Sequence, residues 1–175
     1  MSRRVVLIRA VNVGGTAKLP MAELRDVAQS LGASDVSTYI ASGNLFCVPP
    51  GDPAEFDRAL ESAIETRYGY FREVISRSID ELRAAVDAHP FEVVDEKLNY
   101  LYPLTGTPEP EKVQALVAKP FDDTRIEVIG ADLHIRYGVG VAASKLTPPL
   151  IARTLGVTGT GRNWRTVGKL IELAG

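Results

Sequence analysis

The residues best suited to bind a ligand begin a predicted helix near the end of the chain, where Arg162, Asn163 and Trp164 are consecutive. Trp164 starts an apolar stripe with helical spacing, and either Thr160 or Asn163 is a suitable N-cap. The start of a helix carries unpaired backbone N–H groups and a partial positive charge. Here Arg162 and Arg165 add the forked donors of their guanidinium groups. This pattern favours a phosphate or another anion. The alternative is that a carboxylate elsewhere in the chain pairs with the arginines and that Trp164 belongs to the core.

A second group of candidates follows the first apolar run of the chain, where Asn12, Gly14, Gly15 and Lys18 precede a predicted helix. A strand, a glycine loop, a lysine and a helix form the layout of many phosphate sites. However, the spacing of the Walker motif and the pattern Gly-x-Gly-x-x-Gly are both absent. A plain tight turn is the alternative interpretation.

Three further polar residues, Ser42, Asn44 and Lys145, lie in or beside predicted glycine-rich turns. Amide, hydroxyl and ammonium groups suit the recognition of a hydrogen-bonding anion better than the breaking of bonds. The predicted ligand-binding residues are Asn12, Gly14, Gly15, Lys18, Ser42, Asn44, Lys145, Arg162, Asn163 and Trp164.

Common catalytic patterns are not evident in the sequence. His89 and His134 are not in a His-x3-His arrangement, and the single cysteine, Cys47, allows neither an intrachain disulfide nor a cysteine-based zinc site. No Gly-x-Ser-x-Gly motif is present. We therefore predict no metal and no cofactor, and the sequence leaves open whether the protein is an enzyme.

The first half of the chain reads as β-α-β-β-α-β, with two strands around residue 43 and glycine or proline signals at most boundaries. Asp52, Pro53 and Glu55 form a capping-box-like start for the second helix. This order is typical of a ferredoxin-like (α/β plait) unit, in which two helices cover one face of an antiparallel sheet. We expect this subdomain to comprise residues 1–77.

The second subdomain, residues 78–175, begins with a linking helix that Ser78 and Glu81 open as a capping box. A strand, a helix that begins with proline, a hairpin and two helices then follow. The order β-α-β-β-α-α predicts a second, degenerate plait. The fold class is therefore α+β with two ferredoxin-like subdomains.

Composition indicates an ordinary globular protein, because 45% of its 175 residues are hydrophobic and no run reaches transmembrane length. We expect a cytoplasmic location and no membrane partner. The net charge of −2 argues against a general polyanion binder. The charge is uneven, however, since residues 133–175 hold six Lys and Arg residues against one acidic residue. This basic segment either fits the acidic remainder of the chain or forms a local binding surface.

Several motifs together resemble a bacterial family, the domain of unknown function 1697 (DUF1697). They are Ile8-Arg-Ala-Val-Asn-Val-Gly-Gly15, Leu19-Pro-Met-Ala-Glu-Leu24, Tyr39-Ile-Ala-Ser-Gly-Asn-Leu-Phe46, Ser144-Lys145 and Arg162-Asn-Trp-Arg-Thr-Val167. Members typically carry Gly-Ile where this chain has Ala10 and Val11, and Thr-Thr-Arg-Asn-Trp where this chain has Gly159-Thr160-Gly161. The resemblance implies a two-part α/β fold of the plait type. It implies no established activity, cofactor or catalytic residues.

Three functions are compatible with these features. The first is a binding module for a phosphate-bearing or other anionic ligand, a nucleotide or RNA, although the aromatic ribonucleoprotein motif is absent. The second is an enzyme that acts on a phosphorylated or carboxylated metabolite with Lys145 as electrophile or proton carrier. The third is an interaction protein without a ligand. The sequence identifies no protein partner.

Overall fold

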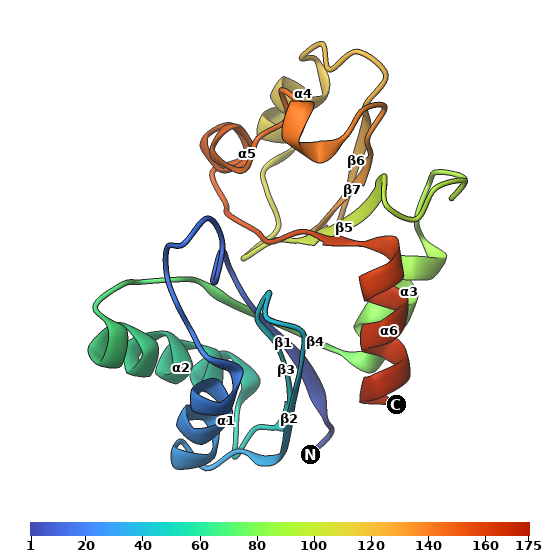
Figure 1. Ribbon diagram of the computed structural model, residues 1–175. Helices are drawn as coiled ribbons and strands as arrows, with labels where there is room; N and C mark the ends of the chain where they lie inside the picture. The colour runs from blue at the N-terminus through green and yellow to red at the C-terminus, as the bar shows by residue number, and fades with distance from the viewer. The chain divides into compact units, whose positions relative to one another are not determined.

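The computed structural model describes all 175 residues and shows an α+β fold with two four-stranded antiparallel sheets and six α-helices (Figure 1). The chain divides into two compact units. The first unit contains Met1–Leu82 and Leu170–Gly175, and the second contains Arg83–Lys169. The predicted division after residue 77 remains a prediction.

The first sheet has the strand order β2-β3-β1-β4, and each neighbouring pair is antiparallel. Each helix that connects two strands therefore crosses over a third strand that lies between them. Figure 1 shows α1 and α2 together on one face of this sheet. The elements are β1 (Arg4–Ile8), α1 (Met21–Ser30), β2 (Ser34–Tyr39), β3 (Asn44–Val48), α2 (Pro53–Tyr68), β4 (Val74–Ser78) and α3 (Ile79–Asp87).

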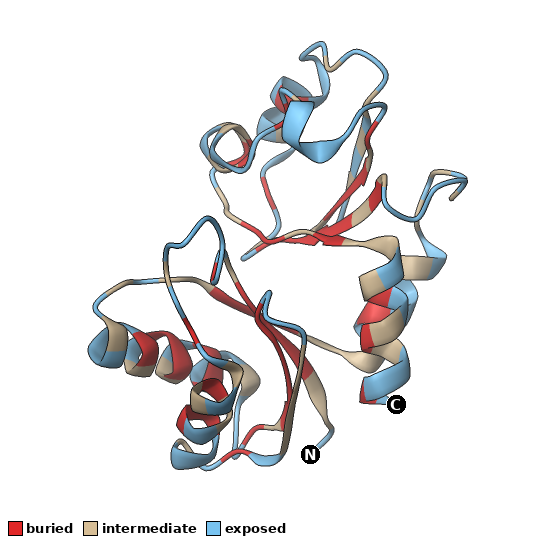
Figure 2. Ribbon diagram, in the orientation of Figure 1, coloured by how far each residue is buried: buried red, intermediate tan, exposed pale blue.

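The helix-covered face of the first sheet is closely packed. Val6 and Ile8 alternate along β1 and belong to one cluster with Leu60 and Ile64 of α2. Of these side chains, none is more than 1% exposed. Figure 2 shows the buried positions of α1 and α2 as stripes, which is the pattern expected of amphipathic helices on a sheet.

The second sheet has the order β6-β7-β5-β8, so its four strands are connected in the same way as those of the first sheet. Its core cluster includes Leu133, Ile135 and, from α5, Ile151 and Leu155. The elements are β5 (Asn99–Pro103), α4 (Pro110–Val117), β6 (Arg125–Ile129), β7 (Asp132–Arg136), the 3₁₀-helix η1 (Val141–Ala143), α5 (Pro148–Leu155), β8 (Arg162–Asn163) and α6 (Trp164–Ala174).

The predicted order β-α-β-β-α-α is wrong in one respect, because the short strand β8 stands between α5 and α6. Only two residues pair with β5, through Tyr100↔Asn163 and Leu101↔Arg162. Two residues carry no detectable alternation, and the glycines before them are rare in strands. The partner strand, rather than local sequence, makes this segment extended.

The Ser78–Glu81 capping box is confirmed, and Asp52 is confirmed as the N-cap of α2. The Asp52 carboxylate accepts hydrogen bonds from the N–H groups of Ala54 at 2.8 Å and Glu55 at 3.0 Å. At the start of α3, Ser78 N–H donates to the Glu81 carboxylate at 2.7 Å and Glu81 N–H donates to the Ser78 hydroxyl at 3.0 Å. Each motif satisfies N–H groups that the helix itself leaves unpaired.

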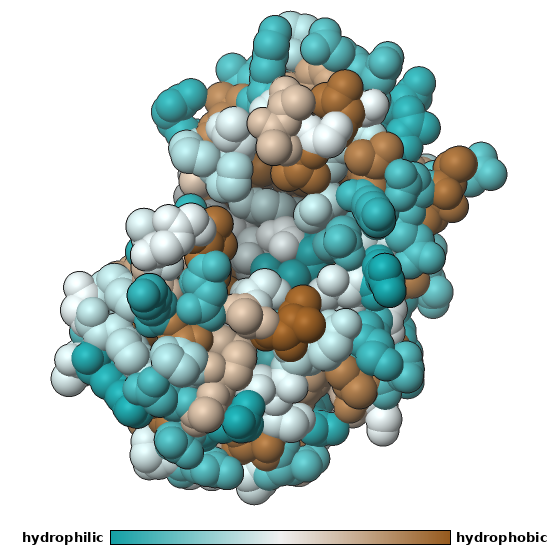
Figure 3. Space-filling view, in the orientation of Figure 1, coloured by the Kyte–Doolittle hydropathy of each residue, from teal (hydrophilic) through white to brown (hydrophobic).

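On the face shown in Figure 3, hydrophobic residues lie in separate small groups among hydrophilic ones. None of the helices combines the length and the apolar character that crossing a bilayer requires.

Candidate ligand-binding site

The predicted glycine loop is a tight hairpin turn. Gly14 and Gly15 both have positive φ, 59° and 75°, as the two central residues of a type I′ turn require. Thr16 N–H donates to the Val13 carbonyl at 3.0 Å, and Asn12 N–H donates to the Ala17 carbonyl at 3.0 Å. The two glycines therefore have a conformational role in the turn.

The side chain of Asn12 braces this hairpin against the turn that follows β2. Its amide donates to the carbonyl oxygens of Leu19 at 2.9 Å and Ala41 at 2.7 Å, and its oxygen accepts from Leu19 N–H at 2.8 Å. Asn12 and Ala41, which this hydrogen bond joins, are 29 residues apart in sequence. The structure thus brings Asn12 and the Ser42–Asn44 turn together, but it uses Asn12 to build the loop.

Asn44 is also part of the loop framework. Its side chain is fully buried, and its amide donates to the Tyr39 carbonyl and the Ser42 hydroxyl, both at 3.0 Å. Gly43 between them has φ 89°, and a Cβ atom there would lie 2.7 Å from Val11 Cγ2. This close approach explains the glycine.

Lys18 is exposed and lies beside an open cavity of about 420 Å³. The start of α1, at Met21, forms part of the same cavity, and no side chain caps that helix. The cavity is lined by Asn12, Gly15, Lys18, Leu19, Pro20, Met21 and Ala41.

At the start of α6, the other predicted anion site, acceptors within the protein bond two of the backbone N–H groups. Trp164 N–H donates to the Glu96 carbonyl at 3.1 Å, and Thr166 N–H donates to the Asn163 side chain at 2.9 Å. Asn163 is therefore the N-cap of α6, one of the two predicted alternatives. Trp164 packs against the His89 ring, with 4.0 Å between the ring centroids and the two ring planes tilted by 35°.

Arg162 is buried, with 8% of its surface exposed. Its guanidinium donates to the Thr160 hydroxyl at 2.7 Å and to the Gly161 carbonyl at 2.9 Å. Burial lowers the pKa of Arg162 to about 10, and nearby Tyr102 partly opposes this shift. The side chain remains a cation at neutral pH and acts as a buried donor.

The second unit contains a more enclosed cavity, of about 370 Å³, on the helix-covered face of its sheet. This cavity was not predicted from the sequence. Its walls combine three tyrosines with the segment that leads from β7 into α5, and Lys145 is an exposed residue of this segment. The lining residues are Tyr100, Tyr102, Tyr137, Val141, Ala142, Ser144, Leu146, Thr147, Pro148, Ile151 and Gly161.

Two glycines fix the position of the Tyr102 ring. A Cβ atom on Gly161 would lie 2.8 Å from Tyr102 Cδ2, and one on Gly159 would lie 2.7 Å from Tyr102 Cε1. The ring thus lies directly against the backbone that leads into β8. Tyr100 meets Tyr137 edge to face at a centroid distance of 5.2 Å, a favourable aromatic geometry.

The polar groups of this cavity are hydroxyls, and its lining contains no carboxylate. Burial raises the pKa values of Tyr100 and Tyr137, so both phenols keep their protons at neutral pH. The Ser144 and Thr147 hydroxyl oxygens already accept hydrogen bonds from Leu146 and Leu150 N–H, at 3.1 Å and 3.4 Å. Their hydrogens are therefore available to donate. The cavity is apolar with donor groups, and a cation lies at Lys145.

The alternation of Tyr100 and Tyr102 along one strand, with Tyr137 after its neighbour, was the signal that could have revealed this cavity. Of the predicted ligand-binding residues, only Lys145 belongs to the segment that forms its wall. Asn163 and Trp164 follow the lining residue Gly161 in the chain, Asn163 at the end of β8 and Trp164 at the start of α6.

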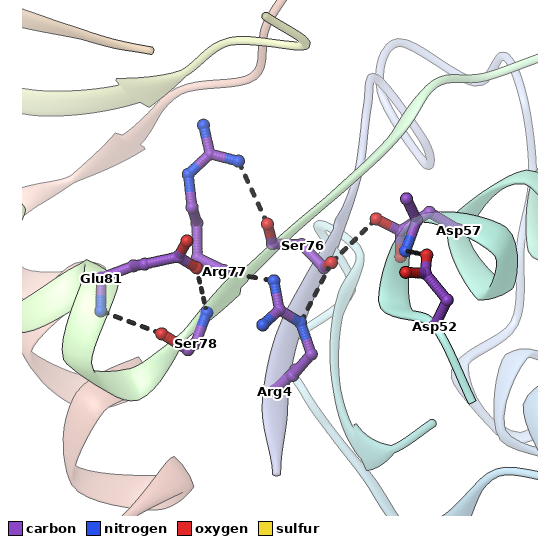
Figure 4. Close-up of polar contacts among 8 residues, drawn as sticks. Arg4, Asp52, Asp57, Ser76, Arg77, Ser78 and Glu81 are labelled. Carbon is purple, nitrogen blue, oxygen red and sulfur yellow. Dashed lines mark hydrogen bonds and ion pairs between the residues drawn. The ribbon is translucent and has the colours of Figure 1, made fainter. Parts of the chain in front are cut away.

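The first unit holds a buried polar group that the sequence analysis also missed. Asp57 of α2 accepts a hydrogen bond from the Ser76 hydroxyl at 2.8 Å, and Ser76 accepts one from Arg4 at 3.4 Å (Figure 4). The other carboxylate oxygen of Asp57 is buried and has no partner. Burial raises the pKa of Asp57 to about 6. Cys47 is buried as well, and burial raises its pKa to about 12, so it is an unreactive thiol at neutral pH.

Comparisons with known proteins give a family and a fold. A family described as "Protein of unknown function (DUF1697)" matches residues 1–134. A solved structure of a conserved bacterial protein from Streptococcus pneumoniae is similar, with a TM-score of 0.79 and 21% sequence identity. The similarity covers 99% of this chain and 98% of that one. A comparison with curated proteins finds no match.

Proposed function

The chain belongs to the DUF1697 family, and we propose that it is a binding protein for a small anionic ligand, with the tyrosine-lined cavity of the second unit as its site. The observation that carries the proposal is the chemistry of this cavity. The apolar and aromatic walls and the donor hydroxyls suit a flat apolar group. Lys145, an exposed residue between the lining residues Ser144 and Leu146, suits an attached phosphate or carboxylate. A volume of about 370 Å³ suits a single nucleotide.

Binding is favoured over catalysis because the cavity lining offers no histidine or carboxylate for proton transfer at neutral pH. The alternative, an enzyme that uses Lys145, requires a second proton carrier, which the ligand itself would have to supply. An interaction protein without a ligand is the outcome if no small anion binds.

Isothermal titration calorimetry with AMP tests the proposal, and adenosine serves as the uncharged comparison. We expect AMP to bind more tightly than adenosine and to bind more weakly as salt increases, because an exposed ion contact is screened. Lys145→Ala should weaken AMP binding about tenfold, the effect of losing one charge-assisted contact of ~1.4 kcal/mol.

Two lysine variants act as controls. Lys119→Ala removes an exposed lysine that lies outside the wall-forming segment between β7 and α5, and it should leave the affinity unchanged. Lys18→Ala tests the composite site predicted from the sequence, since equal losses in Lys18→Ala and Lys145→Ala would place the glycine loop in the same site. Undetectable AMP binding, or full affinity in Lys145→Ala, would contradict the proposal.

Two finer assignments form part of the proposal. We assign residues 1–77 to the ferredoxin-like plait, because their element order and the strand order β2-β3-β1-β4 agree with it. We also place the protein in the cytoplasm, because its single cysteine is a buried free thiol, as is usual in reducing compartments.

A further inference from the structure

The two histidines of the chain, which lie 45 residues apart in sequence, form a hydrogen-bonded pair in the second unit. Their Nδ1 atoms are 2.9 Å apart. His134 is fully buried on β7, and His89, which follows α3, is half-buried. Because His134 alternates with Leu133 and Ile135, the pair lies on the sheet face opposite the tyrosine-lined cavity. This feature is independent of the proposed ligand.

Neighbouring groups determine which nitrogen of each histidine carries the proton. The Asp95 backbone carbonyl can only accept, so the Asn99 amide donates to it at 3.0 Å. Asn99 Oδ1 must then accept from His89 Nε2 at 3.0 Å. Neutral His89 consequently has a lone pair on Nδ1, and His134 Nδ1–H donates to it. His134 therefore takes the less common tautomer, with a lone pair on its buried and unpartnered Nε2.

One additional proton is incompatible with this arrangement. A proton on His89 Nδ1 would place two N–H donors against each other at 2.9 Å. A proton on His134 Nε2 would create a buried cation whose new donor has no acceptor. The pair therefore has one stable proton arrangement while closed, and half-buried His89 is the partner that is able to reach water.

The surroundings of the pair are mainly aromatic and polar. The His89 ring contacts Trp164 at a centroid distance of 4.0 Å and Phe91 at 5.5 Å. The charged or titratable residues nearest in sequence or strand register are Asp87, Asp95 and Glu96 around His89, Glu127 opposite His134 on β6, and Arg125 and Arg136 on the same sheet face. The Glu127 carboxylate is exposed, and Asp95 and Glu96 hydrogen-bond to Asn99 and Trp164 through backbone carbonyls.

We propose that the His89–His134 pair is a proton-operated latch, in which uptake of one proton breaks the hydrogen bond between the rings and releases His89 from Trp164. At neutral pH the latch is closed and holds the segment after α3 against the second sheet. In acid, His89 turns to water as a cation, which the C-terminal end of α3 stabilises.

The pH range of the latch follows from burial. Burial lowers the pKa of both histidines below the usual 6.5, that of His134 to about 4, and His89 lowers the His134 value further. The latch therefore opens below pH 6.5 as acidity increases. Trp164 is the only tryptophan, so its fluorescence reports directly on the position of His89.

Nitrogen-15 NMR of the imidazole rings in the full chain tests the proton arrangement without a substitution. At pH 7.5 we expect the Nε2–H tautomer for His89 and the Nδ1–H tautomer for His134. On acidification both rings should titrate below pH 6.5, together with a change in Trp164 fluorescence. An Nε2–H tautomer for His134, or Trp164 fluorescence that stays constant while His89 titrates, would overturn the latch.

Two variants separate a latch from simple packing. His134→Leu removes the donor that faces His89 Nδ1, so the His89 midpoint should rise towards the ordinary value of about 6.5. A midpoint that remains at the wild-type value contradicts the proposal. Glu127→Gln, which neutralises the exposed carboxylate on β6, is the matched control and should leave both midpoints unchanged.

Discussion

The first and second units connect four strands in the same order, yet only one of them encloses a tyrosine-lined cavity. In the first unit, α2 has 16 residues and covers β1 with large apolar side chains that include Leu60 and Ile64. In the second, the corresponding helix α5 has 8 residues, and the segment before it contains the short helix η1. Beside this shorter helix, Tyr100 and Tyr102 of β5 line the cavity. One topology therefore yields a solid core or a cavity, depending on the length of its second helix.

The units also differ in the direction in which burial shifts the pKa of a buried titratable group. Asp57 in the first unit has a raised pKa, about 6, because burial disfavours its charge. His134 in the second has a lowered pKa, about 4, for the same reason. Burial thus favours the neutral form of both residues, which makes the acid easier to keep protonated and the base easier to keep deprotonated.

The largest effect should come from the solid core. Leu60→Ala removes a fully buried side chain and should lower the free energy of unfolding by about 4 kcal/mol. Val141→Ala, in the cavity wall, removes a side chain that is 40% exposed and should change stability by less than about 0.5 kcal/mol. Urea denaturation of both variants measures the contrast. Equal losses would show that the cavity wall is as tightly packed as the core.

Asp57→Asn should remove the loss of stability that ionisation of the buried Asp57 carboxyl causes at neutral pH. The raised pKa means that the Asp57 contribution to stability is complete below pH 3.8 and is lost as pH rises through about 6. Relative to wild type, the variant should gain up to about 3 kcal/mol in unfolding free energy between pH 4 and pH 7. Denaturation at several pH values gives this difference, and a difference that does not vary with pH would contradict the raised pKa.

His134→Leu should have the opposite pH dependence. The lowered pKa means that the His134 contribution is complete above pH 6.5 and is lost as pH falls through about 4. The unfolding free energy of the variant should therefore improve relative to wild type by up to about 3 kcal/mol between pH 6.5 and pH 4. The same denaturation series checks it, and a parallel trend in the Asp57 and His134 variants would remove the contrast between the units.

The smallest changes in stability are expected from alanine substitutions at two glycines near the C-terminus, and they should have opposite signs. Gly161→Ala places a Cβ atom 2.8 Å from Tyr102 and should cost about 1 kcal/mol or more. Gly168, within α6, has open space around it, so Gly168→Ala should stabilise by about 0.5 to 1 kcal/mol. Thermal denaturation compares the two, and stabilisation by both substitutions would show that Tyr102 does not lie against Gly161.

Local signals in the sequence predicted most of the fold. Asp52 and the Ser78–Glu81 pair define helix starts, and the two strands predicted around residue 43 are β2 and β3. Caps and turns depend on residues that are close in sequence, so their chemistry is readable without tertiary structure.

Features that depend on distant contacts were not predictable. Strand β8 exists through pairing with β5, and the two histidines meet across 45 residues. The role of Asn12 as a loop brace likewise depends on Ala41. Asparagines and glycines near turns were predicted to be ligand groups, and in the structure the Asn12 and Asn44 side chains hydrogen-bond within the turns themselves.

An amide NMR titration of the full chain with AMP tests the central claim most directly, since it reports on the non-proline residues of both units at once. We expect the largest shifts at Tyr137, at Gly161 and in the segment Ser144–Thr147, with little change in residues 12–18. The same titration of Lys145→Ala should give smaller shifts at equal AMP concentration. Largest shifts in the glycine loop, or no saturable shift at the tyrosine-lined cavity, would contradict the assignment of ligand binding to the second unit.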